Sequence, residues 1–277
     1  MNLKNYELID SGNGRRLEKW SDVLVDRPAP QAVWKKNANC KEWEESQIYF
    51  DKKNLKWQIK KDTPSDWCFN IDEISCKLKL SSNGQVGVFP EQLSNWNWIN
   101  KRLSNIERPV KILNAFAYTG VATLVASASS KNVEVWHVDV AKSFITWARE
   151  NASLSGLHDN PIHWVVEDVI TFLEREVKRG HKYDGLILDP PAFGRSQNKI
   201  WKLSKDLPRL IELMGLILND NSAVVSFSWH DPSLSGDTVL KMLNDLPQAK
   251  DRKLEVINLI IPAVKGSDLP AGKCVRF

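Results

Sequence analysis

The sequence VKILNAFAYTGVATLVASA, residues 110–128, joins a short apolar strand to a helix and begins a repeating pattern. Its first half has the character of a buried strand, and the run 121–128 is typical of a helix. Further strands are predicted at VEVWHVD, IHWVVED, YDGLILD and SAVVSFSW, with helices at 141–154, 169–179, 203–218 and 235–246. LEVINLIIP and KCVRF follow as two consecutive strands. This alternation predicts an α/β fold with a doubly wound, mostly parallel sheet that ends in a hairpin.

The first 80 residues have a different character, with short strands broken by polar turns. YELIDSG, WQIKK and KLKLSS are strand-like, and GVFPEQLSNWNWINKRL predicts a helix that links them to the rest. Five of the twelve tryptophans fall in this region. We interpret them as packing for a small core rather than as platforms for bases, because they are not spaced along one strand. The sequence therefore predicts a small strand-rich N-terminal domain, residues 1–80, and a second domain, residues 81–277.

The composition is that of a soluble globular protein with little net charge. Charged residues make up 26% and hydrophobic residues 42%, and the formal net charge is +4. The polar N-terminus does not look like a secretory signal and the longest apolar run is too short to cross a bilayer, so we expect a cytoplasmic protein without membrane contact. The four scattered cysteines predict free thiols and no metal site. The mild positive charge permits an RNA or DNA substrate without requiring one.

Ligands of doubly wound sheets bind beyond the carboxyl ends of the strands, so we consider the residues that end each strand. The first strand runs into Asn114–Gly120, which lacks the GxGxxG turn that the phosphates of a dinucleotide require. This absence counts against NAD and favours a ligand without phosphates. Gly120 fits either a close approach of the backbone to a ligand or a simple turn.

Acidic residues end the next two strands. Asp139 lies about 20 residues after Gly120, the spacing of an acid that binds ribose hydroxyls. Glu167 and Asp168 end the third strand, where an acid can accept a hydrogen bond from an adenine amine. Each acid could instead cap the helix that follows. Three strand ends with suitable chemistry, in order, favour the ligand-binding interpretation more than any one of them.

The fourth strand ends in Asp189-Pro190-Pro191-Ala192-Phe193. Prolines cannot continue a sheet ladder and hold the chain extended, so this loop presents its carbonyl groups in fixed positions. Such a carbonyl can accept a hydrogen bond from an amino group and orient its nitrogen lone pair. Phe193 can stack on a planar substrate. The alternative, a rigid strand exit with a buried Phe193, fits this context less well.

Residues from about Val86 to Trp229 resemble the class I S-adenosylmethionine-dependent methyltransferases related to the bacterial 23S ribosomal RNA methyltransferases that act on cytosine C5 or guanine. The resemblance rests on GxFPEQ, NxFxYTG, VDxS, ARENxxLxGL, ED and DPPxF, which stand here at Gly87–Gln92, Asn114–Gly120, Val138–Lys142, Ala148–Leu157, Glu167-Asp168 and Asp189–Phe193. RRLEKW and RPAPQAVW also resemble the small domain that precedes catalysis in these proteins. The motifs are specific for family and cofactor, and less so for substrate.

The resemblance implies a Rossmann-like fold with a seven-stranded sheet, S-adenosylmethionine as cofactor and S-adenosylhomocysteine as its product. Asp139 would hold the ribose, Asp168 the adenine amine, and Phe89 and Gln92 would cover the site. The implied cofactor-binding set is Phe89, Gln92, Asn114, Phe116, Tyr118, Thr119, Gly120, Asp139, Glu167, Asp168 and Asp189. The implied catalytic set is Asp189, Pro190, Pro191 and Phe193. Ala141 stands where Ser is common, a small departure.

One departure concerns the chemistry. Family members that methylate cytosine C5 use a cysteine after the fifth strand, whereas this chain reads Ser226-Phe227-Ser228-Trp229 and has no cysteine between Cys76 and Cys274. Because C5 must be activated by a covalent thiolate adduct, attack by a nitrogen or oxygen is favoured. His230 and Asp231 could act as base or substrate contact, although such a pair more often only satisfies a loop.

Basic residues follow Phe193 in what we expect to be a loop. Arg195, Lys199 and Lys202 could contact the phosphates of a nucleic acid or form a solvated face. The sequence thus predicts a methyltransferase that acts on RNA, by resemblance. The alternatives are a methyltransferase of a small molecule or protein side chain, and a non-catalytic RNA-binding relative.

Overall fold

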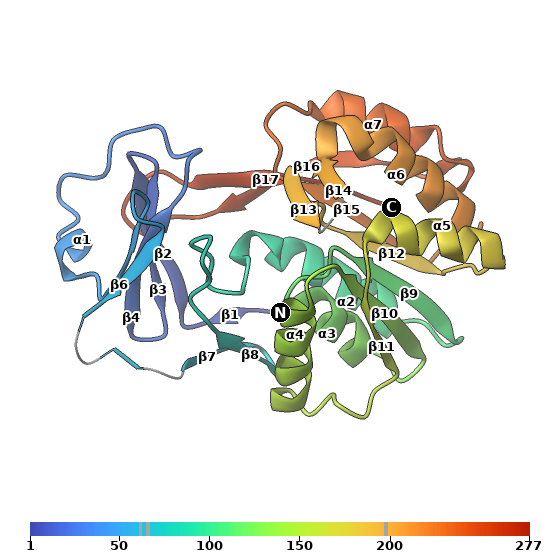
Figure 1. Cartoon of the computed structure of the whole chain (residues 1–277), viewed down its shortest axis with the longest axis horizontal. Coiled ribbons are helices and arrows are strands. Elements are labelled where there is room, and N and C mark those ends of the chain that lie inside the picture. The colour runs from blue at the N-terminus through green and yellow to red at the C-terminus, as the bar shows by residue number, and fades with distance from the viewer. Residues whose placement is uncertain (61–62, 65–66, 197–198) are drawn as a thin grey trace. The chain divides into compact units, whose positions relative to one another are not determined.

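The computed structural model describes residues 1–60, 63–64, 67–196 and 199–277 and divides into two compact units (Figure 1). The first contains Met1–Leu93 and Leu259–Ala271, and the second contains Ser94–Asn258 and Gly272–Phe277. The division thus follows Leu93 rather than residue 80, and a segment near the C-terminus belongs with the N-terminal part. The sequence analysis divided the chain into two consecutive segments and did not include this return of the chain to the first unit.

The first unit is strand-rich, as predicted. It holds a five-stranded sheet in the order β2-β3-β4-β5-β6 and a three-stranded sheet in the order β1-β7-β8. Residues 259–271 join it because the backbone N–H groups of Val264 and Lys265 donate to the carbonyls of Leu8 (2.8 Å) and Ile9 (2.9 Å). The elements are β1 Leu3–Lys4, β2 Tyr6–Gly12, β3 Arg15–Trp20, β4 Val23–Pro28, α1 Glu42–Glu45, β5 Ile48–Asp51, β6 Lys56–Ile59, β7 Trp67–Ile71, β8 Ile74–Leu78 and the 3₁₀ helix η1 Pro90–Gln92.

Tryptophans contribute to the core of this unit. Trp20 is fully buried and packs its ring 4.6 Å from Tyr6 and 5.1 Å from Phe69, measured between ring centres. The indole N–H of Trp34 donates to the Ser11 carbonyl (2.8 Å), and that of Trp43 donates to Asp10 (2.8 Å). The packing interpretation is confirmed for these three side chains.

The predicted seven-stranded sheet, in the order β11-β10-β9-β12-β15-β17-β16, lies mainly in the second unit, and the parts of β16 and β17 within residues 259–271 belong to the first. The five strands from β11 to β15 in this order are parallel, and β17 is antiparallel to β15. The elements are α2 Leu93–Ser104, β9 Val110–Ala115, α3 Val121–Ser129, β10 Val133–Asp139, α4 Lys142–Leu154, β11 Ile162–Val166, α5 Val169–Arg179, β12 Gly185–Leu188, α6 Leu203–Ile217, β15 Val224–Trp229, α7 Gly236–Asn244, η2 Pro247–Ala249, β16 Glu255–Ile261 and β17 Leu269–Arg276.

The strand order reverses between β9 and β12, which identifies the switch point of the sheet. Leu188 of β12 lies opposite Ala115 of β9 and Phe227 of β15, so β9 and β12 end level with each other and β15 extends two residues further. The segments that follow them therefore leave the sheet at the same edge. This places the 116–120 loop beside the segment that begins at Asp189.

The segment after Phe193 is not the loop that we expected. Phe193–Ser196 and Lys199–Lys202 form an antiparallel two-stranded hairpin, β13 and β14. The indole N–H of Trp201 donates to the Pro191 carbonyl (2.7 Å), which fastens the hairpin to the stiff proline segment. Neither strand shows the apolar–polar alternation that would have predicted it from sequence, and the hydrogen bond from Trp201 to Pro191 helps to stabilise the hairpin.

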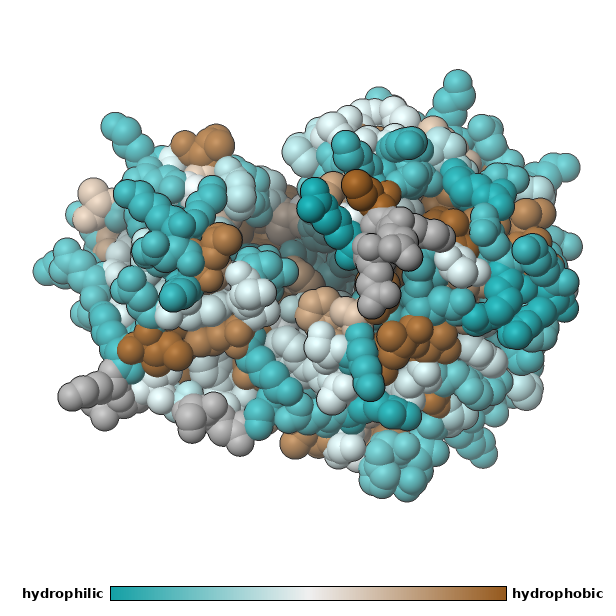
Figure 2. All heavy atoms as spheres, in the orientation of Figure 1, coloured by the Kyte–Doolittle hydropathy of each residue, from teal (hydrophilic) through white to brown (hydrophobic). Residues whose placement is uncertain are grey.

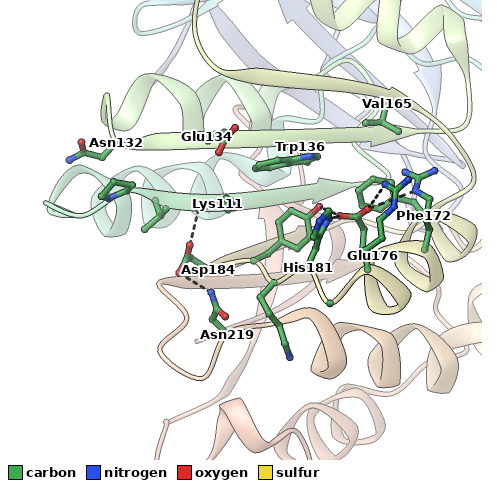
Figure 3. Close-up of a pocket in the computed structure, with 17 residues that line it drawn as sticks. Lys111, Asn132, Glu134, Trp136, Val165, Phe172, Glu176, His181, Asp184 and Asn219 are labelled. Carbon is green, nitrogen blue, oxygen red and sulfur yellow. Dashed lines mark hydrogen bonds and ion pairs between the residues drawn. The ribbon is translucent and has the colours of Figure 1, made fainter.

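A cavity of about 600 Å³ lies toward the amino ends of β9, β10 and β12, away from the switch point (Figure 3). The Glu176 carboxylate is buried beside it and accepts hydrogen bonds from the Tyr183 hydroxyl (2.8 Å) and His181 Nδ1 (2.9 Å). These hydrogen bonds help to hold the pKa of Glu176 below its usual value, against the opposing effect of burial. The Glu176 carboxylate thus forms its hydrogen bonds with side chains of the fold itself.

The surface seen in Figure 2 is mainly hydrophilic, with separate, smaller hydrophobic patches. Among the described residues, no helix combines the length and apolar character needed to cross a membrane.

Candidate active site at the carboxyl ends of the strands

The loop that follows β9 has an unusual backbone. Phe116, Tyr118 and Gly120 all have positive φ angles, of 56°, 50° and 88°. A side chain makes this conformation unfavourable by roughly 1–2 kcal/mol, so Phe116 and Tyr118 persist because the surroundings fix them. A Cβ on Gly120 would lie 2.9 Å from the Cβ of Ala148, so this glycine permits close packing of α4. Strained loops of this kind concentrate at binding sites.

Asp139 holds this loop against the end of β10. Its carboxylate accepts hydrogen bonds from the backbone N–H groups of Tyr118 (2.9 Å) and Ala141 (2.9 Å). Burial raises the pKa of Asp139, and these hydrogen bonds act in the opposite direction. Asp139 is not itself the N-cap residue of α4, because Ala141 holds that position, but its bond to the Ala141 N–H also supports the start of this helix. Asp139 thus connects the loop after β9 with the start of α4.

The two acids after β11 behave differently from each other. Asp168 caps α5, since its carboxylate accepts hydrogen bonds from the Thr171 N–H (3.0 Å) and hydroxyl (2.8 Å). The Glu167 side chain forms an ion pair with Arg175, while its backbone N–H donates to the Asp139 carbonyl (3.1 Å). The structure therefore joins Asp139 and Glu167 through the backbone. Contact of Asp168 with an adenine stays a prediction.

Four buried polar side chains that support the loop were missed or assigned otherwise from sequence. Asn114 is 3% exposed. Its side-chain amide forms hydrogen bonds with Thr123 (2.8 Å) and with the Ile187 carbonyl (3.2 Å), and the second of these links β9 to β12. The Thr123 hydroxyl also contacts His137 Nδ1 (2.8 Å). From α4, the buried Asn151 donates to the Thr119 carbonyl (2.9 Å). A polar residue on an otherwise apolar strand or helix face was the signal that could have identified them.

We expect His137 to make folding stability depend on pH. Burial lowers its pKa to about 3. The unfolded chain, with a histidine pKa of about 6.5, binds this proton first as the pH falls, so stability is lost between these values by up to about 1.4 kcal/mol per pH unit. Urea unfolding at pH 7, 6 and 5 should therefore show a steeper loss for the native chain than for His137→Gln, which has no titrating ring. Equal slopes would contradict this role.

The carboxyl ends of β12 and β15 bring Asp189 and His230 together. Asp189 Oδ1 accepts a hydrogen bond from the Ser228 hydroxyl (2.7 Å) and lies 3.1 Å from His230 Nε2. The side chains of Asp189 and His230 are 28% and 33% exposed, so both reach the surface. Asp231 instead accepts hydrogen bonds from the Ser233 N–H (2.9 Å) and hydroxyl (2.6 Å). The sequence analysis considered His230 and Asp231 together. In the structure Asp231 forms hydrogen bonds within its own loop, whereas His230 faces Asp189.

The proline segment presents an exposed aromatic ring. Pro190 is buried and Pro191 is exposed, and Phe193 is 50% exposed rather than buried. The Arg195 guanidinium lies 5.5 Å from the centre of the Phe193 ring. Cross-strand pairing puts Lys202 opposite Phe193, on the same face of the hairpin. The Lys199 side chain lies outside the described residues.

The other face of the hairpin contacts the loop after β9. Trp201 lies 5.1 Å from Phe116 between ring centres, so the two segments on either side of the switch point touch. Tyr118 packs on α4, with its ring centre 4.5 Å from that of Phe144. Phe116 thus lies toward the hairpin and Tyr118 toward the helix.

Phe89 and Gln92 lie in the first unit, at the start of η1 and at its end. Gln92 is 7% exposed, and its backbone N–H donates to the Phe89 carbonyl (3.0 Å). Their implied role in covering the site stays a prediction.

The cysteine of the second unit is not placed as a nucleophile. Cys274 on β17 is fully buried, and burial raises the pKa of its thiol to about 12. Its sulfur lies 3.6 Å from the Ser226 hydroxyl. A thiol with this pKa is almost entirely protonated at neutral pH, so it supplies no thiolate for covalent catalysis.

Comparison with known proteins found similar chains among solved structures and curated proteins, while no protein-family model matches. The crystal structure of a S-adenosylmethionine-dependent methyltransferase from Agrobacterium tumefaciens is similar with a TM-score of 0.90 and 31% identity, over 99% of this chain and 90% of that chain. Ribosomal RNA large subunit methyltransferase K/L of Pseudoalteromonas atlantica is 28% identical over 66% of this chain, and methyltransferase I of Erwinia tasmaniensis is 29% identical over 53%. The chain spans only 24% and 37% of the lengths of these two curated relatives.

Proposed function

We propose that this chain, which belongs to the family of S-adenosylmethionine-dependent methyltransferases, transfers a methyl group to a nitrogen of a base in RNA. One observation carries the proposal: Asp189 and the half-exposed ring of Phe193 lie at the switch-point edge of the sheet, on the two sides of a stiff proline pair. This arrangement provides a hydrogen-bond acceptor and a stacking surface at the place where such sheets bind ligands.

The residues on the β9 and β10 side fit the cofactor. The acid at the end of β10 can accept hydrogen bonds from a ribose diol, and the adjoining strained loop has no glycine-rich cradle for phosphates. S-Adenosylmethionine would be held by the loop 114–120 together with Asp139 and Asp168. When bound, it supplies an activated methyl group on a positively charged sulfur.

The residues on the β12 side would position the acceptor. We assign to Asp189 and to the Pro190 carbonyl the hydrogen bonds from an amino group, which orient its nitrogen lone pair. Phe193 would stack on the ring that carries this amino group. Because a neutral amine needs little proton transfer before attack, the main contribution of these residues is orientation, which can supply a large part of a rate enhancement.

The properties of Cys274 support a nitrogen acceptor. Cytosine C5 requires a thiolate adduct, and the thiol of Cys274 is buried with a raised pKa. No other cysteine lies in the second unit, because the remaining three precede residue 77.

Two independent facts support RNA as the substrate. The two curated relatives carry names of ribosomal RNA methyltransferases. The exposed face of the hairpin combines Phe193 with Arg195 and Lys202, a pairing of aromatic ring and cations that suits a single-stranded nucleic acid. A cytoplasmic location is proposed with it, because four free thiols suit a reducing compartment.

The test is incubation with S-adenosylmethionine labelled in its methyl group and with RNA, protein and metabolite fractions of cells. We expect label in RNA, recovered as an N-methylated base after digestion, and a rate that falls steeply with salt because phosphate contacts release counterions. Label in the metabolite or protein fraction, transferred at a rate independent of salt, would support the corresponding alternative substrate. Tight cofactor binding without transfer to any fraction would support a non-catalytic relative.

Asp139→Ala should weaken the binding of S-adenosylmethionine and S-adenosylhomocysteine by roughly 1–3 kcal/mol, because buried donors would lose their acceptor. Calorimetry measures this directly. Asp159→Ala is the matched control, since the side chain of Asp159 is 91% exposed and should leave affinity unchanged. Unchanged affinity in Asp139→Ala would mean that this carboxylate serves only the fold.

A further inference from the structure

The carboxylate of Asp189 is held by side chains from the neighbouring strand. Ser228 lies in β15 and His230 follows that strand directly, and both contact the same oxygen, Oδ1, at 2.7 and 3.1 Å. Residues two apart in extended chain point to the same side, which explains why these two reach one atom. Two contacts from outside its own segment therefore position this carboxylate oxygen.

A third strand makes room for the His230 ring. Gly272 of β17 has a φ of 125°, which disfavours any residue with a side chain. A Cβ there would lie 2.7 Å from His230 Nδ1 and 2.8 Å from the Trp229 carbonyl oxygen. The imidazole thus packs directly on the backbone of β17. β12, β15 and β17 together fix the contact between His230 and Asp189.

Stability alone does not account for this construction. Both side chains are about one-third exposed or less, so both still reach solvent and neither is sealed in the core. Pairs of this kind near the surface contribute little to stability, typically about 0–1 kcal/mol. The contact nevertheless involves the one carboxylate of the Asp189–Phe193 segment, which is the segment assigned to the acceptor.

We propose that His230 is a positioning residue for methyl transfer. Its Nε2–H donates to Asp189 Oδ1 and, with Ser228, holds the carboxylate in the orientation in which it accepts a hydrogen bond from the acceptor amine. The amine nitrogen forms the new bond to carbon, the sulfur keeps the electrons of the broken bond, and the surplus N–H proton passes to solvent. His230 therefore acts through Asp189, and this inference rests on the proposed function.

The experiment compares His230→Leu and His230→Gln in the assay with labelled S-adenosylmethionine and total cell RNA. His230→Leu should lower the maximal rate at least tenfold, while the KM values for cofactor and RNA change less than twofold. His230→Gln should recover the rate to within threefold of the native chain, because its amide N–H can reach the same carboxylate oxygen. Asp231→Asn, the adjacent acid that only satisfies its loop, should leave the rate unchanged.

Gly272→Ala provides a second route to the same contact. It should displace the imidazole and slow transfer as His230→Leu does, and the double variant should be no slower than the slower single one. A glutamine variant as slow as the leucine variant, an unchanged rate in His230→Leu, or a loss confined to KM would overturn the inference. If the native chain labels protein or metabolites instead, the same variants are compared on that fraction. If it labels no fraction, the proposed function fails and this inference fails with it.

Discussion

Asp189→Ala is expected to slow methyl transfer at saturating cofactor by at least about 100-fold, the scale of a misplaced reacting group. The alanine removes the carboxylate that would accept the hydrogen bond from the acceptor amine, and it leaves Ser228 and His230 without their shared partner. Single-turnover measurement of the transfer step, with labelled cofactor and the RNA fraction that takes up label, gives this rate.

Two further variants separate chemistry from folding. Asp189→Asn keeps an acceptor oxygen of similar shape and should lose less activity than the alanine variant. Asp237→Ala changes an exposed acid in the first turn of α7 and should transfer at the native rate. A native rate in Asp189→Ala, with unaltered thermal unfolding, would remove Asp189 from the proposed mechanism.

Phe193→Ala is expected to slow transfer to RNA by about 10- to 100-fold, since stacking of one base on an aromatic side chain contributes roughly 1–3 kcal/mol. The affinity for S-adenosylmethionine should stay nearly unchanged, because the cofactor is assigned to the loops after β9, β10 and β11. The ratio of maximal rate to KM for RNA, together with calorimetric titration of the cofactor, tests both parts.

The hairpin itself offers the matched control for this variant. Ile200 is 62% exposed and pairs with Arg195 on the face that carries Phe193. Ile200→Ala removes apolar area from that face but no aromatic ring, so it should retain most of the activity, and Phe193→Tyr should as well. Equal losses in Ile200→Ala and Phe193→Ala would indicate a general effect on the hairpin rather than stacking.

The sequence by itself was sufficient for the architecture of the second unit. Apolar strand runs and helical spacing are local patterns, and they predicted α3 and α5 to within a residue and β10 over its full length. They also predicted the two consecutive strands at the end of the chain, which are neighbours in the sheet as β16 and β17. Because each strand could be recognised from its local pattern, the residues that end it could be identified as well. In a doubly wound sheet these residues lie at the edge where ligands bind.

Only the tertiary structure decided which side chains meet at that edge. The contact of Asp189 with His230 joins residues 41 positions apart, and the hydrogen bond of Asp139 to Tyr118 joins residues 21 apart. Local pattern carries no information about such pairs. The same limit applies to the return of residues 259–271 to the first unit, which depends on hydrogen bonds to Leu8 and Ile9. A hydrogen bond forms wherever the fold brings donor and acceptor within about 3 Å, and only the packing of the whole chain sets that distance.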